Sequence, residues 1–344
     1  MPDASLTCLQ KCIIMNDKKR VLSGFRPSGK LHLGHLFGAL SNWLKLQEVH
    51  RCFYFVADWH ALTTEYKNTT LIEENTLDMV ADWLAVGLDP GKSVIFVQSA
   101  IIEHAELNLL FSMFTRIARL ERVPSFKDVQ QETGRQDLDT IGFLSYPLLQ
   151  SADILMYNAH YVPVGVDQLP HIELTRETAR KFNELYGEVF IEPEGLLTEA
   201  PKVPGTDGRK MSKSYGNAIF LSDPPEAVEA KLLPMKTDVR RQRRSDPGVP
   251  EDCPVFDLQK IFSSDDTVKW VHEGCKTAGI GCIECKRALI PKINEVLAPI
   301  RERRATFDYE KVRQVLREGN KSALEFSRGA MRRVREAMKF QVKL

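Results

Sequence analysis

Short apolar runs of strand length alternate with longer helical patterns along the first part of the chain, and this alternation constrains the fold more than any other feature. The runs with strand character are Val21–Ser23, Cys52–Val56, Val94–Val97 and Tyr161–Val164. Between the second and the third, apolar residues recur at helical spacing from Ile72 to Leu84. Strands that alternate with helices indicate a parallel sheet with crossover helices, so we expect an α/β domain.

The pattern changes at residues 201–210, PKVPGTDGRK, a segment rich in proline, glycine and charge that we interpret as a loop. Beyond Ser222 the chain is predicted to be helical. We therefore predict an N-terminal extension over residues 1–19, an α/β domain over residues 20–221 and an all-helical domain over residues 222–344. The last helix is a candidate for packing back on the α/β domain.

Composition excludes some classes of protein. The 344 residues are 43% apolar and 27% charged, which is ordinary for a soluble globular protein. No uninterrupted apolar run approaches the roughly 18 residues of a membrane span. The N-terminus shows no secretory signal, so we expect a cytoplasmic protein. The formal net charge of +1 argues neither for nor against a nucleic-acid partner.

The segment GFRPSGKLHLGH, residues 24–35, directly follows the first predicted strand. Its PSG turn would offer backbone N–H groups and a hydroxyl to a phosphate. His32 and His35 would open a helix and add donors to a region that already favours anions. Gly34 would let an adenine or a ribose approach the backbone. Taken alone, the segment also fits two exposed histidines beside an ordinary turn.

A second segment, KMSKS at residues 210–214, lies near the end of the predicted α/β domain, after its last predicted strand. Two lysines three residues apart on a loop could close over a triphosphate. They would then neutralise the charge that builds on a leaving pyrophosphate. Taken alone, a charged surface loop is the alternative interpretation.

The two segments together resemble the signatures of the class I aminoacyl-tRNA synthetases, over roughly residues 20–340. The resemblance implies a Rossmann-like catalytic domain that binds ATP, with Mg²⁺ held mainly by the phosphates. Catalysis would rest on positioning and on charge stabilisation by His32, His35, Lys210 and Lys213. The residues implied to bind ATP are Arg26, Pro27, Ser28, Gly34, His35, Gly165, Val166, Asp167, Lys210, Met211, Ser212, Lys213 and Ser214.

Two further stretches, GFLSYPLLQSADIL at residues 142–155 and VGVDQ at residues 164–168, resemble the tryptophanyl and tyrosyl subgroup. In the tryptophanyl family the aspartate at Asp153 accepts the indole N–H, the one polar handle of that ring. Leu22 stands where the tyrosyl family has a tyrosine, so tryptophan is the implied substrate and tyrosine the alternative. The residues implied to bind tryptophan are Leu22, His60, Gln150, Asp153 and Gln168.

Four cysteines follow a C-x21-C-x6-C-x2-C spacing: Cys253, Cys275, Cys282 and Cys285. Four thiolates suit a zinc ion or an iron–sulfur cluster, and free buried thiols are a third interpretation. A subset of tryptophanyl-tRNA synthetases resembles this pattern and carries a [4Fe–4S] cluster near the tRNA anticodon, which implies a cluster here and leaves zinc as the alternative. Elsewhere, Cys8 and Cys12 are expected to be structural or free, and Cys52 to be a core residue.

The family also implies partners. tRNA(Trp) would be the nucleic-acid substrate, and the basic run Lys236–Arg244 suits phosphate contacts, although it also fits a solvated loop. A homodimer contact is implied around residues 105–150. The rival functions are a small-molecule nucleotidyltransferase and a non-catalytic iron–sulfur paralogue that binds RNA. KMSKS and the predicted helical C-terminal domain count against the nucleotidyltransferase, and the two intact signature segments count against the paralogue.

Overall fold

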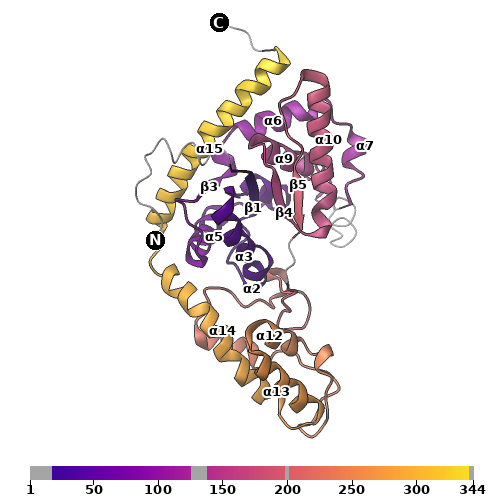
Figure 1. Cartoon of the computed structure of the whole chain (residues 1–344), viewed down its shortest axis with the longest axis vertical. Coiled ribbons are helices and arrows are strands. Elements are labelled where there is room, and N and C mark those ends of the chain that lie inside the picture. The colour runs from indigo at the N-terminus through magenta and orange to yellow at the C-terminus, as the bar shows by residue number, and fades with distance from the viewer. Residues whose placement is uncertain (1–17, 125–137, 198–200, 341–344) are drawn as a thin grey trace.

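The computed structural model describes residues 18–124, 138–197 and 201–340. At its centre lies a parallel sheet of five strands in the order β3-β2-β1-β4-β5 (Figure 1). The strands are β1 (Arg20–Phe25), β2 (Arg51–Val56), β3 (Ser93–Val97), β4 (Tyr161–Val164) and β5 (Glu194–Leu197). The predicted α/β fold is confirmed. Strand β5 was missed, since EGLL is short, begins with a charge and contains a glycine.

The strands are buried on both faces, as is typical of parallel sheets. Cys52, Tyr54 and Val56 of β2 enter one apolar cluster, whereas Phe53 and Phe55 enter another on the opposite face. The prediction that Cys52 is a core residue is therefore confirmed. Cys8 and Cys12 lie outside the described residues.

The order of the strands reverses at β1, which pairs with β2 on one side and with β4 on the other. In open parallel sheets, ligands bind beyond the carboxyl ends of the strands at such a reversal. Segments that follow β1, β2, β3 and β4 therefore meet at one edge of the sheet. All the segments that we predicted to bind ATP or an amino acid, except KMSKS, begin at these strands or on the helix before β4.

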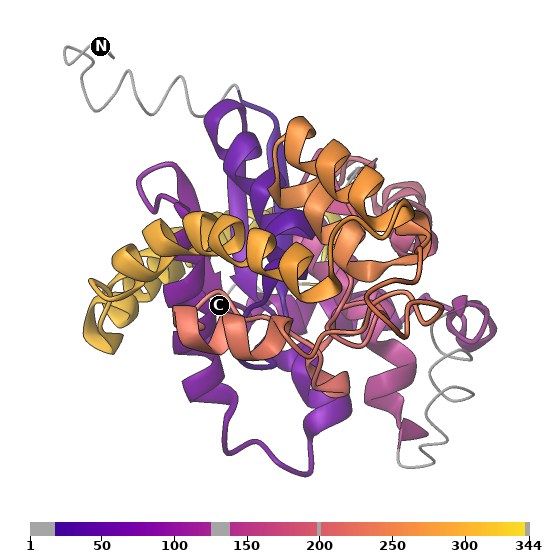
Figure 2. The ribbon, with the colours of Figure 1, turned by 90° about the horizontal axis from the view of Figure 1, so that it is seen from below.

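Helices surround the sheet, and those of the C-terminal part lie in front of it when the molecule is seen from below (Figure 2). The helices between the strands are α2 (Leu33–His35), α3 (Ser41–Val49), α4 (Asp58–Glu65), α5 (Ile72–Val86), α6 (Glu103–Ser112), α7 (Ile117–Leu120), α9 (Ile141–Met156) and α10 (Leu169–Tyr186). The later helices are α11 (Pro225–Leu232), α12 (Pro254–Phe262), α13 (Asp265–Lys276), α14 (Cys282–Arg304) and α15 (Tyr309–Met338). In the described part of the chain, no helix has the length and apolar character that crossing a membrane requires.

The last helix, α15, returns from the helical part and runs along strand β3 at the edge of the sheet (Figure 1). A Cβ atom at Gly319 would stand 1.8 Å from the carbonyl oxygen of Ile95, so the two backbones are in direct contact. The side chain of Asn320 accepts the N–H of Val97 at 2.9 Å. The helix therefore covers a strand edge that would otherwise expose unpaired backbone groups.

Candidate active site

The HLGH segment begins α2, and its two histidines point their Nδ1 atoms at the backbone. Nδ1 of His32 accepts the N–H of Gly34 at 3.1 Å, and Nδ1 of His35 accepts the N–H of His32 at 3.2 Å. Burial lowers the pKa of His32 to about 4 and that of His35 to about 3, so both rings are neutral at pH 7. A neutral ring that accepts at Nδ1 carries its proton on Nε2. Each histidine therefore keeps one N–H to donate to a ligand.

Gly34, predicted to let an adenine or a ribose approach the backbone, also leaves room for the ring of His32. A Cβ atom at this position would stand 2.9 Å from the ring of His32, so the ring itself occupies the space beside the glycine. The glycine thus lets His32 fold back onto the start of the helix.

Lys213 joins the two signature segments, which are far apart in the sequence. Its Nζ donates to Oγ of Ser28 at 3.0 Å and to the carbonyl oxygen of Gly29 at 3.1 Å. Burial lowers the pKa of Lys213 to about 8. Lys210 and Arg26 are exposed. The structure therefore brings Lys213 onto the predicted phosphate turn and leaves Lys210 at its rim.

Asn217, which was not predicted from the sequence, holds the backbone of the KMSKS loop by hydrogen bonds. The residue is 2% exposed, and its Oδ1 accepts the N–H of Ser212 at 2.8 Å. Its Nδ2 donates to Asp207 at 2.7 Å and to the carbonyl oxygen of Lys210 at 3.2 Å. No pattern in the sequence marks an asparagine just after a motif as its support, so only the fold reveals this residue.

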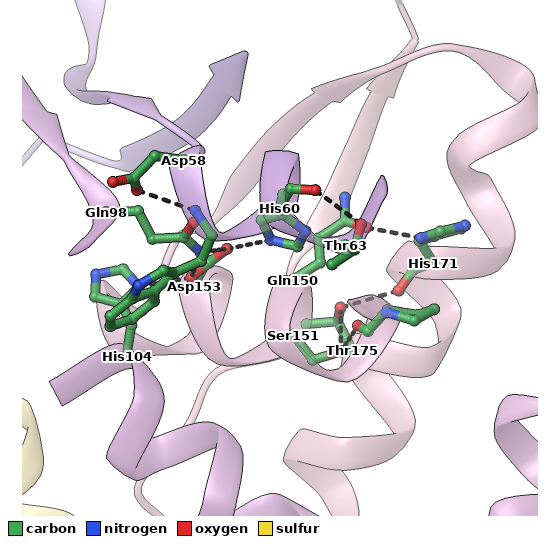
Figure 3. Close-up of polar contacts among 12 residues, drawn as sticks. Asp58, His60, Thr63, Gln98, His104, Gln150, Ser151, Asp153, His171 and Thr175 are labelled. Atoms are coloured by element: carbon green, nitrogen blue, oxygen red, sulfur yellow. Dashed lines mark hydrogen bonds and ion pairs between the residues drawn. The ribbon is translucent and has the colours of Figure 1, made fainter. Parts of the chain in front are cut away.

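Asp153, on α9, is fully buried beyond the ends of the strands and accepts hydrogen bonds from three side chains (Figure 3). His60 Nε2 lies 2.8 Å from Oδ2, and His104 Nδ1 lies 2.6 Å from Oδ1. Nε2 of Gln98 donates to both oxygens, at 2.8 and 2.9 Å. Burial alone would raise the pKa of Asp153, but the hydrogen bonds from His104 and His60 outweigh it and lower this pKa below its usual value. The carboxyl group is therefore ionised.

The hydrogen bonds extend from Asp153 to Tyr157. Because an ionised carboxylate only accepts, His104 donates from Nδ1. Its Nε2 forms a hydrogen bond with the hydroxyl of Tyr157 at 3.0 Å. The sequence analysis missed both of these residues and Gln98. A usable signal existed for Gln98, since it directly follows β3 and polar residues at strand ends gather at one edge of the sheet.

The other residues predicted to bind tryptophan differ in burial and in their partners. Gln150 and His171 are hydrogen-bonded at 2.7 Å, beside the ring of Tyr146, which lies 5.5 Å from that of His171 (Figure 3). Leu22 is 1% exposed inside an apolar cluster and belongs to the core beneath the site. Gln168 is exposed on the short turn η4 (Val166–Gln168) after β4. Three residues predicted to bind ATP lie at the same exposed turn: Gly165, Val166 and Asp167.

Cys253 directly precedes α12, Cys275 lies in α13, and Cys282 and Cys285 lie in the first turn of α14. All four line one cavity. Nη1 of Arg241 donates to Sγ of Cys275 at 3.7 Å, and Nε2 of Gln259 donates to Sγ of Cys285 at 3.6 Å. Nε of Arg241, which also lines the cavity, is buried and has no partner within the described residues. Across residues 18–124, 138–197 and 201–340, no three cysteine, histidine or acidic side chains are grouped as a single metal ion would require.

Much of the predicted RNA-contacting run Lys236–Arg244 is engaged within the protein. Arg240 pairs with Asp238 at 2.8 Å. Arg241 donates to the carbonyl oxygen of Ile280 at 2.6 Å, and Arg244 to that of Ala278 at 3.1 Å. These arginines hold the loop that wraps the cysteine cavity, which the sequence analysis did not anticipate.

Comparisons with known proteins agree with this geometry. The family model of the class I tRNA synthetases (W and Y) matches residues 15–298. The chain is 57% identical to the tryptophan–tRNA ligase of Thermotoga maritima, across 93% of this chain and 98% of that protein. It is 46% identical to the tryptophan–tRNA ligase of Aquifex aeolicus, across 93% and 99%. The crystal structure of tryptophanyl-tRNA synthetase from Campylobacter jejuni, complexed with ADP and tryptophan, matches with a TM-score of 0.84 and 33% identity, covering 93% of this chain and all of that one.

Proposed function

We infer that this chain, which belongs to the class I tRNA synthetases for tryptophan and tyrosine, is a tryptophan–tRNA ligase. It activates L-tryptophan with ATP to tryptophanyl-adenylate and transfers the tryptophanyl group to the 3′ end of tRNA(Trp). The observation that carries the choice of amino acid is Asp153, a buried and ionised acceptor at the ends of the strands. An indole ring presents one donor, and Asp153 can accept it.

In the first step, an oxygen of the tryptophan carboxylate attacks the α-phosphorus of ATP. The new P–O bond forms as the bond to the bridging oxygen breaks, and pyrophosphate leaves with the electron pair. His32 and His35 donate Nε2–H groups to the phosphates, and Lys213 exchanges its contacts with Ser28 and Gly29 for phosphate oxygens. Lys210 approaches from the rim, and Mg²⁺ is held by the phosphates. A ribose hydroxyl of the tRNA then attacks the acyl carbon, and AMP leaves.

The tryptophan side chain lies over Asp153, with its N–H on one carboxylate oxygen. Gln98 shares its Nε2 between both oxygens in the present arrangement, so it can keep one contact and yield the other. His60, Gln150 and Gln168 border the amino acid. Leu22 acts from beneath, where an aliphatic side chain offers no partner to a tyrosine hydroxyl.

The remaining ATP contacts are assigned to backbone and small side chains. Arg26 and Pro27 flank the phosphate turn, and Gly34 keeps His32 in place. The exposed turn after β4 contacts the ribose and the adenine. The residues of this turn and of the closing loop are Gly165, Val166, Asp167, Met211, Ser212 and Ser214.

A homodimer is supported by an apolar surface on α6, α7 and the start of α9. Leu109, Met113, Ile117 and Ile141 are large apolar residues there, and between 56% and 85% of each is exposed. Helices α6 and α7 both pack against α9, and large apolar side chains left exposed on neighbouring elements mark contact sites in soluble proteins. The predicted contact region around residues 105–150 includes residues 125–137, which lie outside the described residues.

The four cysteines are proposed to hold a [4Fe–4S] cluster. Their shared cavity supports this, and so does the unpartnered Nε–H of Arg241, which a cluster sulfide can accept. A zinc ion would draw four sulfurs to about 2.3 Å from one centre. A cluster is larger than a single ion and needs a cavity, and all four cysteines line one. When bound, the cluster would supply an electron-transfer centre. The thiols of the described cysteines are free, which fits the reducing cytoplasm that we propose as the compartment.

Anaerobic purification tests the cluster. We expect a brown protein with iron and sulfide and an absorbance band near ~400 nm. Cys282→Ser should lose the band, and Cys52→Ala, a change at a core cysteine far from the cavity, should keep it. A colourless protein that carries zinc would contradict the proposal.

Charging of tRNA tests the whole reaction. Radiolabelled tryptophan should be transferred to a tRNA(Trp) transcript and not to a tRNA(Tyr) transcript. A chain that forms the adenylate without charging either tRNA would instead be a paralogue with another acceptor.

A further inference from the structure

Asp82, on α5, is a buried carboxylate that contacts the backbone directly before the first signature histidine. Its Oδ2 accepts the N–H of Leu31 at 3.1 Å. Its Oδ1 accepts Nε–H of Arg304, the last residue of α14, at 3.1 Å. The side chain of Asp82 is only 4% exposed. One carboxylate therefore links the ATP-binding segment to the end of the helical part of the chain.

The segment that Asp82 contacts is held on its other side by residues that follow KMSKS. The N–H of Leu33 donates to the carbonyl oxygen of Ile219 at 3.0 Å, and the N–H of Leu221 donates to that of Leu31 at 2.9 Å. Both imidazoles of this segment are fixed by its own backbone N–H groups. The direction of their Nε2–H donors therefore depends on where this backbone lies.

Arg304 has a second acidic partner, which differs from Asp82 in one respect. Nη2 of Arg304 donates to Oδ1 of Asp78 at 2.8 Å, and the hydroxyl of Tyr309, at the start of α15, donates to the same oxygen at 3.0 Å. Asp78 and Asp82 thus both dock the junction of α14 and α15 on α5. In the described residues, the backbone of Leu31 bonds to Asp82 and not to Asp78.

We propose that Asp82 is a positioning residue for ATP, which fixes the backbone of the HLGH segment while Arg304 fixes Asp82. This proposal rests on the assignment of HLGH to ATP in the proposed function. Each oxygen of Asp82 has its own donor, so an asparagine cannot replace it. If the amide oxygen accepted from Leu31, the amide NH₂ would face the Nε–H of Arg304; the reverse orientation would place NH₂ against the N–H of Leu31.

Calorimetric titration of the full chain with Mg·ATP, and separately with tryptophan, tests the proposal. Asp82→Asn should weaken ATP binding about tenfold, since either the buried backbone N–H of Leu31 or the half-buried guanidinium of Arg304 loses its acceptor. Tryptophan binding should stay within about twofold of wild type. The matched control is Asp78→Asn, which keeps an oxygen for its two donors and removes the same charge beside Arg304. Asp78→Asn should leave the affinities for ATP and for tryptophan within about twofold of wild type.

Three results would overturn the proposal. The first is an unchanged ATP affinity in Asp82→Asn. The second is a loss of ATP affinity in Asp78→Asn equal to that in Asp82→Asn, and the third is an equal loss of ATP and tryptophan affinity in Asp82→Asn. The last two would indicate a general role in docking the helices. Should Asp82→Asn fail to fold, Arg304→Gln removes the partner that fixes Asp82 and serves as the second test. We expect a several-fold loss of affinity for ATP and not for tryptophan. An unchanged affinity for ATP would contradict the proposal. A wild-type chain that binds ATP but shows no tryptophan-dependent exchange would refute the proposed function, and the Asp82 comparison would still stand.

Discussion

The chemistry of the signature residues is set by burial and by their nearest hydrogen bonds. His32 and His35 are neutral because they are buried, and their free donors are Nε2–H groups because the backbone occupies Nδ1. Lys213 is the cation that already stands on the phosphate turn. The neutral histidines can donate across the working pH range, so the lysine is the group whose charge changes with pH.

The pKa of Lys213, lowered by burial to about 8, predicts an alkaline decline in activity. A lysine is charged below its pKa, so kcat/KM for ATP should be constant below pH 8. It should fall up to tenfold per pH unit above, because kcat/KM reports the free enzyme. Lys213→Arg should remove this decline, since a guanidinium stays charged. A wild-type profile that is flat to pH 10 would contradict the assignment.

His104 is predicted to hold Asp153 in place for the indole. His104→Phe removes the donor at 2.6 Å from Oδ1 and leaves a buried charge short of one hydrogen bond. We expect KM for tryptophan to rise ~10-fold or more, with KM for ATP unchanged. His104→Asn, whose amide can donate from the position of Nδ1, should recover part of the loss. Equal effects on both substrates would indicate a general loss of structure.

At the residue scale, the sequence pointed to candidates inside recognisable motifs and missed partners that come from distant elements. The HLGH and KMSKS segments and Asp153 were singled out because the residues around them resemble those of a known family. His104 and Asp82 were missed because their hydrogen-bond partners come from elements that only the fold brings together. Gln98 was missed although its place directly after β3 was a usable signal. The ring of His32 beside Gly34 was also missed.

At the scale of elements, hydrophobic periodicity located the first four strands to within two residues at either end. It also located helix α5. Periodicity could not reveal that α15 packs on β3, since an amphipathic helix does not specify its partner. The sequence shows a glycine within a helical pattern at Gly319, but it does not show that the backbone of Ile95 lies against it.

Gly319 and Gly329 offer a matched pair of substitutions on α15. Gly319→Ala would force a methyl group into the carbonyl of Ile95, and we expect a loss of about 1–3 kcal/mol in the free energy of unfolding. Gly329 has nothing within 4 Å of its added Cβ, so Gly329→Ala should stabilise the helix by roughly 0.5–1 kcal/mol. Urea denaturation measures both. Two changes of the same sign would show that α15 does not contact β3 as described.

At the scale of the whole molecule, the sheet and the helical part have separate tasks. The sheet carries the adenylation chemistry, and α14 and α15 connect the helical part to α5 and β3. The parallel sheet followed by helices could be predicted from the sequence. The sequence did not predict that arginines of the basic run would bind the carbonyls around the cysteine cavity.

The apolar surface on α6 and α7 predicts a dimer that one charge can disrupt. Met113 is 66% exposed, and Met113→Glu should shift the protein from dimer to monomer in sedimentation experiments, since a carboxylate would be buried in the contact. Val239 is 70% exposed in the helical part, and Val239→Glu should leave the dimer intact. A monomeric wild-type protein, or a variant that stays dimeric, would contradict this interface.

The central claim is tested most directly by ATP–pyrophosphate exchange with each of the twenty amino acids, on wild type and on Asp153→Ala. The account predicts exchange with tryptophan alone in the wild type and its loss in the variant. Exchange with tyrosine would keep the fold and the chemistry of ATP but contradict the role given to Asp153 and Leu22. Exchange with no amino acid would contradict the assignment of the chain as a tryptophan–tRNA ligase.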